Sequence, residues 1–312
     1  MDHVFFDFTK QFARQIRVLS IAAKLIIVVI VVAGLIGHIN KSDAVTSTEP
    51  YSVLVVAGQS NAQGDNSFAG QMNPQLGSHP ADTATKILWS TGDDQFIVNW
   101  RNSPTDQLIP LTSVQPDGYF GPEVSLARSL WDQGRRNMVI LKVTYGLQRL
   151  SVTPNNAFGG LADWNVSSTG ESYDNLKLKK SQLASIMQSN NDKYTMDGFY
   201  WVQGESDTVK GVSTAGYQTD LENLLTSVKS DLGMHPDAKN ILGKISSQFC
   251  ITNAYNFIYN PEGCGINACL LANYPCSDIA TITQGNTNVR QAIQNVADAD
   301  PATFVVETED LA

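Results

Sequence analysis

Five short apolar runs recur along this chain with helical patterns between them, and this alternation restricts the fold more than any other feature. Such runs, rich in β-branched or aromatic residues, are typical of strands buried in a parallel sheet. The runs are 51–57 (YSVLVVA), 138–144 (MVILKVT), 198–202 (GFYWV), 241–246 (ILGKIS) and 303–307 (TFVVE). Helical patterns occupy 123–133, 175–189, 217–231 and 288–298. Strands that alternate with helices predict an α/β fold with a parallel sheet.

Two regions depart from this alternation. Residues 64–120 are rich in Gly, Pro, Asn, Asp and Ser, and we expect them to form loops over the carboxyl edge of the sheet. Residues 250–287 hold all four cysteines, so we expect a Cys-rich insertion there with two local disulfides, in one of three connectivities. A zinc site is the alternative, but the spacings are not paired as C-x-x-C and no His lies nearby. We expect no metal.

The N-terminal segment predicts a membrane anchor. Residues 18–39 are almost entirely apolar, and about 20 such residues span the hydrocarbon core as a helix. Lys and Arg residues gather before the centre of this run, so the positive-inside tendency places the N-terminus in the cytoplasm. A long cleavable signal peptide is the alternative, although no small-x-small motif directly follows the run.

We therefore expect a single-pass type II membrane protein with four parts. These are a cytoplasmic tail (1–17), a transmembrane anchor (18–39), a linker (40–50) and a folded domain (51–312). That domain would lie outside the cytoplasm, in the lumen of the secretory pathway or at the cell surface. A sequon at Asn165-Val166-Ser167 is consistent with this compartment.

The net charge argues against one class of partner. The chain carries a formal charge of -9 at pH 7. A nucleic-acid-binding protein needs a positive surface to neutralise phosphates, so we expect no nucleic-acid partner.

A serine stands directly after the first predicted strand, in Gly58-Gln59-Ser60-Asn61. Glycine at position 58 lets the backbone turn sharply where a Cβ would clash. A hydroxyl in such a turn lies at the carboxyl edge of the sheet, and its own backbone N–H can face a developing oxyanion. A polar turn without chemistry is the alternative interpretation.

Three segments in order resemble those of a known family. They are GQSN (58–61), FGPE (120–123) and WVQGESD (201–207), each at the boundary of a predicted element. Together they resemble the SGNH hydrolases, in the sialate O-acetylesterase-like branch that includes carbohydrate acetylesterases. The likeness covers roughly residues 51–310. It implies a three-layer α/β/α domain with a five-stranded parallel, flavodoxin-like sheet.

The resemblance also implies roles for individual residues. Ser60 would be the nucleophile, and the oxyanion would accept hydrogen bonds from the N–H groups of Ser60 and Gly146 and from the side chain of Gln203. The branch usually has Gly-Gly-Thr where this chain has Gly146-Leu147-Gln148, so the second glycine is replaced. Supporting roles would fall to Gly58, Gln59, Asn61, Glu123, Gly204, Glu205 and Asp207. Local capping or ion pairing is an equally good explanation for Glu205 and Asp207.

A base for Ser60 is missing from the sequence. In the family it is a His in an Asp-x-x-His segment after the last strand, and none of the four histidines here stands in that motif. We expect the sequence to end before this base. His79 could instead enter the site from its loop. We expect His235 to lie far from Ser60, because a loop that enters a parallel strand is at the opposite edge.

The resemblance implies a carboxylic ester hydrolase that removes O-acetyl groups from carbohydrates and needs no cofactor. Its partners would be the acetylated carbohydrate substrate and, through the N-terminal helix, the membrane. A non-catalytic glycan-binding module on the same scaffold is the alternative that the missing His leaves open. A lipase or thioesterase of the same superfamily is a third.

Overall fold

The structure is a computed structural model that describes residues 49–64, 78–92, 101–113, 120–146, 148–152, 162–209, 211–247 and 279–307. The chain divides into two units, Met1–Ser42 and Asp43–Ala312, and every described residue belongs to the second. The predicted tail, the anchor and all four cysteines lie outside the described residues. No helix in the described part is long and apolar enough to cross a membrane.

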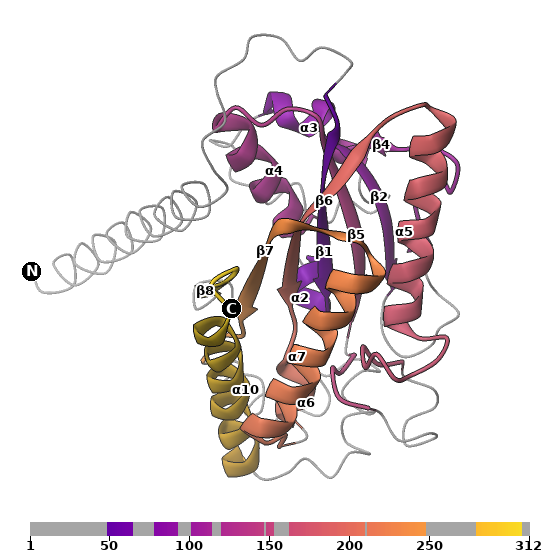
Figure 1. Ribbon diagram of the computed structural model, residues 1–312. Helices are drawn as coiled ribbons and strands as arrows, with labels where there is room; N and C mark the ends of the chain where they lie inside the picture. Colours follow the sequence, from indigo (N-terminus) through magenta and orange to yellow (C-terminus); the bar gives the residue numbers. More distant parts are fainter. Residues whose placement is uncertain are drawn as a thin grey trace, which may run out of the picture. The chain divides into compact units, whose positions relative to one another are not determined.

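A mostly parallel sheet of eight strands forms the centre of the domain (Figure 1). Its order is β3-β2-β5-β1-β6-β7-β8, and the short strand β4 also pairs with β2. The bounds are β1 (Tyr51–Gly58), β2 (Lys86–Gly92), β3 (Arg101–Asn102), β4 (Ile109–Pro110), β5 (Met138–Tyr145), β6 (Tyr194–Val202), β7 (Met234–Lys244) and β8 (Thr303–Glu307). Only β3 and β4 run antiparallel to their partner.

The five predicted strands correspond to β1, β5, β6, β7 and β8. Their spatial order is 2-1-3-4-5 in chain order, which is the flavodoxin-like arrangement that the resemblance implies. The count of five is wrong, however, because β2 adds a sixth parallel strand beside β5. It lies inside the segment that we expected to be loops. Its sequence, KILWSTG, is nearly all buried but short, and turn-forming residues surround it.

Helices cover both faces of the sheet. The helices α5 (Ser172–Ser189), α7 (Thr214–Asp231) and α10 (Ile279–Ala299) share one hydrophobic cluster with alternate residues of the strands. Leu141 and Val143 of β5 belong to this cluster, so Lys142 between them faces the opposite side. There its side chain meets α4 (Pro122–Asp132). This places two helical layers around one sheet, as Figure 1 shows.

Short helices complete the described fold. They are α2 (Ser60–Gln63), α3 (Pro80–Ala84), η4 (Leu111–Ser113) and α6 (Glu205–Val209). Helix α2 begins two residues after β1 ends, and α6 begins three residues after β6 ends. Because parallel strands end at the same edge, both helices lie at the carboxyl edge of the sheet. That edge is where ligands bind in such sheets.

Candidate active site

Ser60 occupies the first position of the one-turn helix α2 and is half-buried. The turn closes through two backbone bonds, from the Gln63 N–H to the Gln59 carbonyl at 2.9 Å and from the Gly64 N–H to the Ser60 carbonyl at 2.8 Å. At the start of a helix the backbone N–H groups have no carbonyl one turn earlier to bond. The Ser60 N–H is therefore a suitable donor for an oxyanion beside its own hydroxyl.

Gly58 lets β1 pass directly into this turn. Its φ is +137°, and a Cβ at this position would lie 2.0 Å from the carbonyl oxygen of Val202 in the neighbouring strand. The next residue, Gln59, donates its backbone N–H to the same Val202 carbonyl at 3.0 Å. The turn that carries Ser60 is thus fixed against the end of β6, and only glycine fits at position 58.

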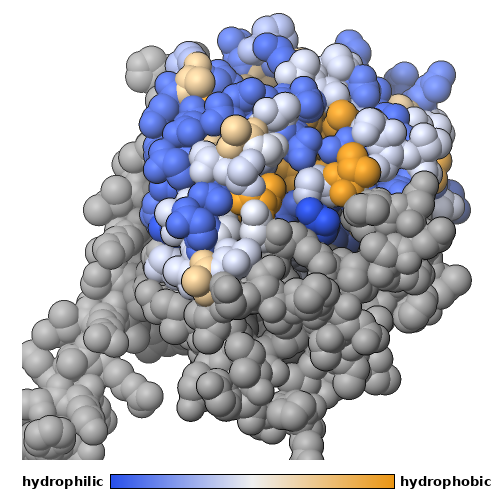
Figure 2. Space-filling model, turned by 90° about the horizontal axis from the view of Figure 1, so that it is seen from below, coloured by the Kyte–Doolittle hydropathy of each residue, from blue (hydrophilic) through white to orange (hydrophobic). Residues whose placement is uncertain are grey.

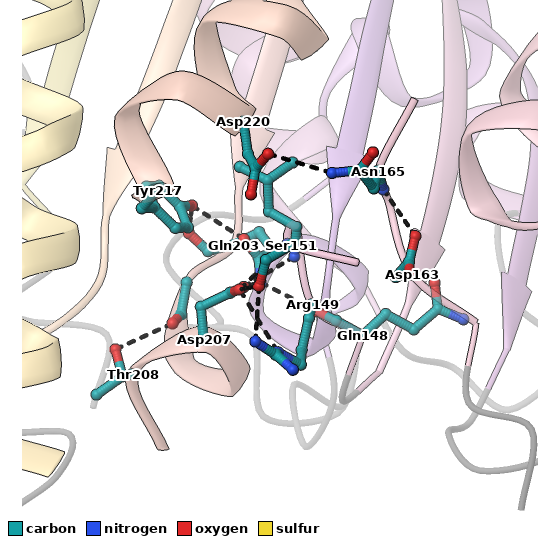
Figure 3. A network of polar contacts seen from close by, with 12 residues as sticks. Gln148, Arg149, Ser151, Asp163, Asn165, Gln203, Asp207, Thr208, Tyr217 and Asp220 are labelled. Atoms are coloured by element: carbon teal, nitrogen blue, oxygen red, sulfur yellow. Dashed lines mark hydrogen bonds and ion pairs between the residues drawn. The ribbon is translucent and has the colours of Figure 1, made fainter. Parts of the chain in front are cut away.

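Gln203 follows β6 and is completely buried at the centre of a polar network (Figure 3). Its amide nitrogen contacts three acceptors: Gln59 Oε1 at 3.2 Å, the Gln148 carbonyl at 3.0 Å and Asp207 Oδ2 at 2.7 Å. Tyr217 donates its hydroxyl to Gln203 Oε1 at 2.9 Å. The two N–H groups of the amide are therefore directed at protein acceptors, which differs from the predicted role as a donor to an oxyanion.

Asp207 holds the segment after β5 against the end of β6. The carboxylate accepts hydrogen bonds from the backbone N–H of Leu150 at 2.8 Å and of Ser151 at 3.2 Å, and from the Ser151 hydroxyl at 2.5 Å. Arg149 Nε lies 3.6 Å from the same carboxylate. Figure 3 shows these side chains converging on Asp207. Through these donors Asp207 joins the segment after β5 to the segment after β6.

Glu205 has a different environment. Burial, together with the negative charge of Asp207, raises the pKa of Glu205 to about 7. Asn61 of the nucleophile turn donates its side-chain amide to Glu205 Oε1. The other oxygen, Oε2, is buried and has no hydrogen-bond partner among the described residues. Glu205 is thus linked to the residue that follows Ser60 in the chain. A carboxyl group that is half ionised near neutral pH is suited to proton transfer.

Gly146, the second predicted backbone donor, forms a backbone hydrogen bond with the neighbouring strand in this structure. Its N–H donates to the carbonyl of Gly92, at the end of β2, over 3.1 Å. A backbone N–H has a single hydrogen, so this one is already used within the sheet. Of the three predicted donors, the Ser60 N–H is the one that the described contacts leave available.

Two histidines fall within the described residues, and both lie at the opposite edge of the sheet. His79 caps the start of α3, which leads into β2, and its Nε2 lies 3.0 Å from Asp132. His235 is the second residue of β7 and is exposed. Helix α3 lies far from α2 and α6 in Figure 1. The structure therefore does not support His79 as the base for Ser60. His235 lies at the edge opposite Ser60, as the direction of its strand predicts.

The surface at the carboxyl edge is chemically mixed. Figure 2 looks onto this edge, where small groups of hydrophobic residues lie between hydrophilic ones in the described part. Val152, 51% exposed, follows the segment held by Asp207.

Comparison with known proteins identifies the family. A family model described as carbohydrate esterase, sialic acid-specific acetylesterase, matches residues 50–264. The chain belongs to this family of carbohydrate esterases. The match includes all three motifs, with Ser60, Glu123 and Glu205, so the resemblance inferred from those motifs is confirmed.

Three solved structures are similar to this chain. A protein from Arabidopsis thaliana is 14% identical, covers 84% of this chain and 87% of its own, and has a TM-score of 0.49. NanS is 18% identical over 72% of this chain and 78% of its own, with a TM-score of 0.41. A carbohydrate acetylesterase from Xanthomonas citri is 12% identical over 84% of this chain and 50% of its own, with a TM-score of 0.46. A search of the curated proteins gives no match.

Sequence reasoning missed one residue next to the candidate site, Lys142. It pairs with the predicted residue Glu123 at 2.9 Å, on the face of the sheet beneath the nucleophile turn. The signal was present in the sequence, since a lysine stands inside the otherwise apolar strand MVILKVTY. A buried lysine needs a partner, and the strand pattern alone does not say where that partner comes from.

Proposed function

We propose that this protein is a serine esterase that removes O-acetyl groups from carbohydrates. One observation carries the proposal: a half-exposed serine at the carboxyl edge is followed in its turn by Asn61, which donates to a buried carboxyl group of raised pKa, in a chain of the carbohydrate esterase family. Family membership also favours an enzyme over the non-catalytic glycan-binding module.

The reaction proceeds in two steps. Ser60 Oγ bonds to the acetyl carbon as its proton leaves, and the Ser60 N–H stabilises the negative oxygen of the tetrahedral intermediate. The bond to the sugar oxygen then breaks, and that oxygen takes up a proton. Water attacks acetyl-Ser60, which releases acetate and restores the hydroxyl. Glu205 governs the proton transfers, either as the base or as the carboxylate that orients a His outside the described residues.

Acetate release from an O-acetylated sialoside tests this function. The full chain should release acetate, and Ser60→Ala should lower the rate at least about 1000-fold, the scale of losing a nucleophile. Ser185→Ala is the matched control, because that serine is exposed on α5 and bonds only a carbonyl of its own helix. Undiminished release by Ser60→Ala would contradict the proposal. Binding of the glycan without any turnover would favour the non-catalytic module.

We also propose that residues 18–39 anchor the domain at a membrane with the esterase outside the cytoplasm. The apolar run and the basic residues before it support this placement. In cells, the full chain should stay with the membrane fraction after alkaline carbonate extraction. A chain that begins at Asp43 should be released. Full-length protein in the soluble fraction would contradict the anchor, and a mature N-terminus after residue 39 would indicate a cleaved signal peptide.

A further inference from the structure

Lys142 and Glu123 form an ion pair in the interior of the domain. Lys142 lies in the middle of β5, all of whose residues are buried, and Glu123 is in the first turn of α4. Both side chains are completely inaccessible to water, and Lys142 Nζ is 2.9 Å from Glu123 Oε1. Removing two charges from water costs several kcal/mol per ion, so a pair in this place calls for a reason.

The pair connects three segments that are distant in the sequence. Lys142 Nζ also donates to the carbonyl oxygen of Gln63 at 2.8 Å. Gln63 is the last residue of α2, the turn that begins with Ser60. Glu123 Oε1 accepts the backbone N–H of Gly121 at 2.8 Å. A strand, the start of a helix and the end of the nucleophile turn thus meet at one ammonium group and one carboxylate oxygen.

The turn has no free space on this side. A Cβ at Gly64 would lie 2.0 Å from the Phe120 carbonyl oxygen, so the backbones of these two segments are in direct contact. The last carbonyl groups of a helix lack partners within it, and here Lys142 satisfies that of Gln63. With Ser60 only three residues earlier in a single closed turn, a tilt of the turn at Gln63 moves the Ser60 hydroxyl as well.

Stability alone explains the pair poorly. Apolar residues of similar volume often replace a buried ion pair without loss of stability, or with a gain. Glu123 has a separate explanation, because a carboxylate in the first turn favours the start of a helix. No comparable explanation applies to Lys142, which lies in the middle of a strand. Its contact with the Gln63 carbonyl is what an apolar side chain could not provide.

We propose that the Lys142–Glu123 pair positions the nucleophile by fixing the end of the Ser60 turn, an inference that rests on the proposed function. Lys142 holds the turn and Glu123 holds Lys142. Neither touches the substrate, so both are positioning residues. Their loss lowers the rate of the chemical step and leaves substrate affinity and the fold largely in place.

The double variant Lys142→Met/Glu123→Met tests this inference, since it removes both charges and keeps side chains of similar length. We expect kcat to fall about 10- to 100-fold, the scale of a misplaced reacting group, with KM within about threefold of the parent. The thermal midpoint should stay well above the assay temperature. Labelling of Ser60 by a fluorophosphonate should slow in parallel, which a purely structural pair would not cause.

A second ion pair on the same helix is the matched control. Arg128 of α4 pairs with Asp82 of α3 at 2.7 Å, toward the opposite edge of the sheet from Ser60. Arg128→Met/Asp82→Asn should lower the thermal midpoint without changing kcat by more than about twofold. If the first double variant does not fold, Lys142→Met/Glu123→Gln gives the same comparison, because the neutral amide keeps the shape of Glu123 and its oxygen can still accept the N–H of Gly121.

The outcomes separate the two proposals. A folded Lys142 variant with kcat and labelling rate within about threefold of an active parent overturns the positioning role alone. An equal fall of kcat in the Arg128–Asp82 control overturns it too, because the loss is then not specific to the Ser60 turn. A parent that neither releases acetate nor is labelled at Ser60 overturns the proposed function and the positioning role with it.

Discussion

The protonation of Glu205 decides how this site behaves with pH. Removal from water favours the neutral carboxylic acid, and the charge of Asp207 adds to that effect, while the hydrogen bond from Asn61 opposes it. The balance leaves the pKa of Glu205 at about 7. The Glu205 side chain is therefore protonated at pH 5, where it cannot accept a proton, and ionised at pH 8, where it can.

We expect kcat/KM of the parent to rise with pH and to level off above about pH 7, because the ionised form of Glu205 is the active one. Glu205→Gln keeps the contact with Asn61 but cannot ionise. The variant should therefore lose most of the activity, and its kcat/KM should no longer rise with pH near pH 7. A pH–rate profile of both proteins measures this. An unchanged limb in the variant would assign the titration to another group.

The contacts at single residues show where sequence reasoning stops. The motif GQSN places Ser60 correctly at the end of β1, because a strand followed by a glycine turn has few alternatives. The pKa of Glu205 depends on how deeply the fold buries it, which the motif does not encode. The N–H of Gly146 bonds to Gly92 of β2, and the sequence did not predict this contact because β2 lies in a segment that resembles loops. The role of Gly146 as an oxyanion donor stays a prediction.

At the scale of elements, β1, α2 and β6 form one unit whose geometry depends on Gly58. We expect Gly58→Ala to lower the free energy of unfolding by at least about 3 kcal/mol and to abolish activity. Both the positive φ and the contact with the Val202 carbonyl oppose a Cβ.

Gly134→Ala is the control for this change. Gly134 also has a positive φ, of +91°, but nothing lies within 4 Å of its Cβ position. This variant should lose only about 1–2 kcal/mol and keep its activity. Chemical denaturation and acetate release measure both variants. Equal losses in the two would mean that the contact with β6 does not matter.

The alternation of strands and helices predicted the elements well where packing is regular. The predicted helix 175–189 lies within α5, and the run 303–307 coincides with β8. The strand β7 begins at Met234, before its predicted start at position 241, because its first residues are mostly exposed and carry no apolar pattern. Pairing with a neighbouring strand, which the sequence does not reveal, decides such boundaries.

For the whole molecule, the raised pKa of Glu205 makes stability depend on pH. The ordinary value is 4.5, so between about pH 4.5 and 7 the folded protein holds a proton that the unfolded chain has lost. Stability therefore falls as the pH rises through this window. The upper limit is about 3 kcal/mol, at about 1.4 kcal/mol per unit of pKa.

Glu205→Gln should remove this dependence, because glutamine resembles the protonated acid and stays neutral. Urea denaturation at pH 5 and pH 8 compares the two proteins. The parent should lose more stability between these values than the variant, by roughly 1–3 kcal/mol. A parent and variant with the same pH dependence would show that Glu205 is ionised in the folded protein throughout.

During turnover Ser60 should carry the acetyl group of the substrate. Acid quenching during steady-state hydrolysis of an acetyl ester, followed by peptide mapping by mass spectrometry, tests this directly. We expect one acetyl group on the peptide that contains Gly58-Gln59-Ser60-Asn61, and none in that peptide from Ser60→Ala. Turnover with the acetyl group on a different residue would contradict it.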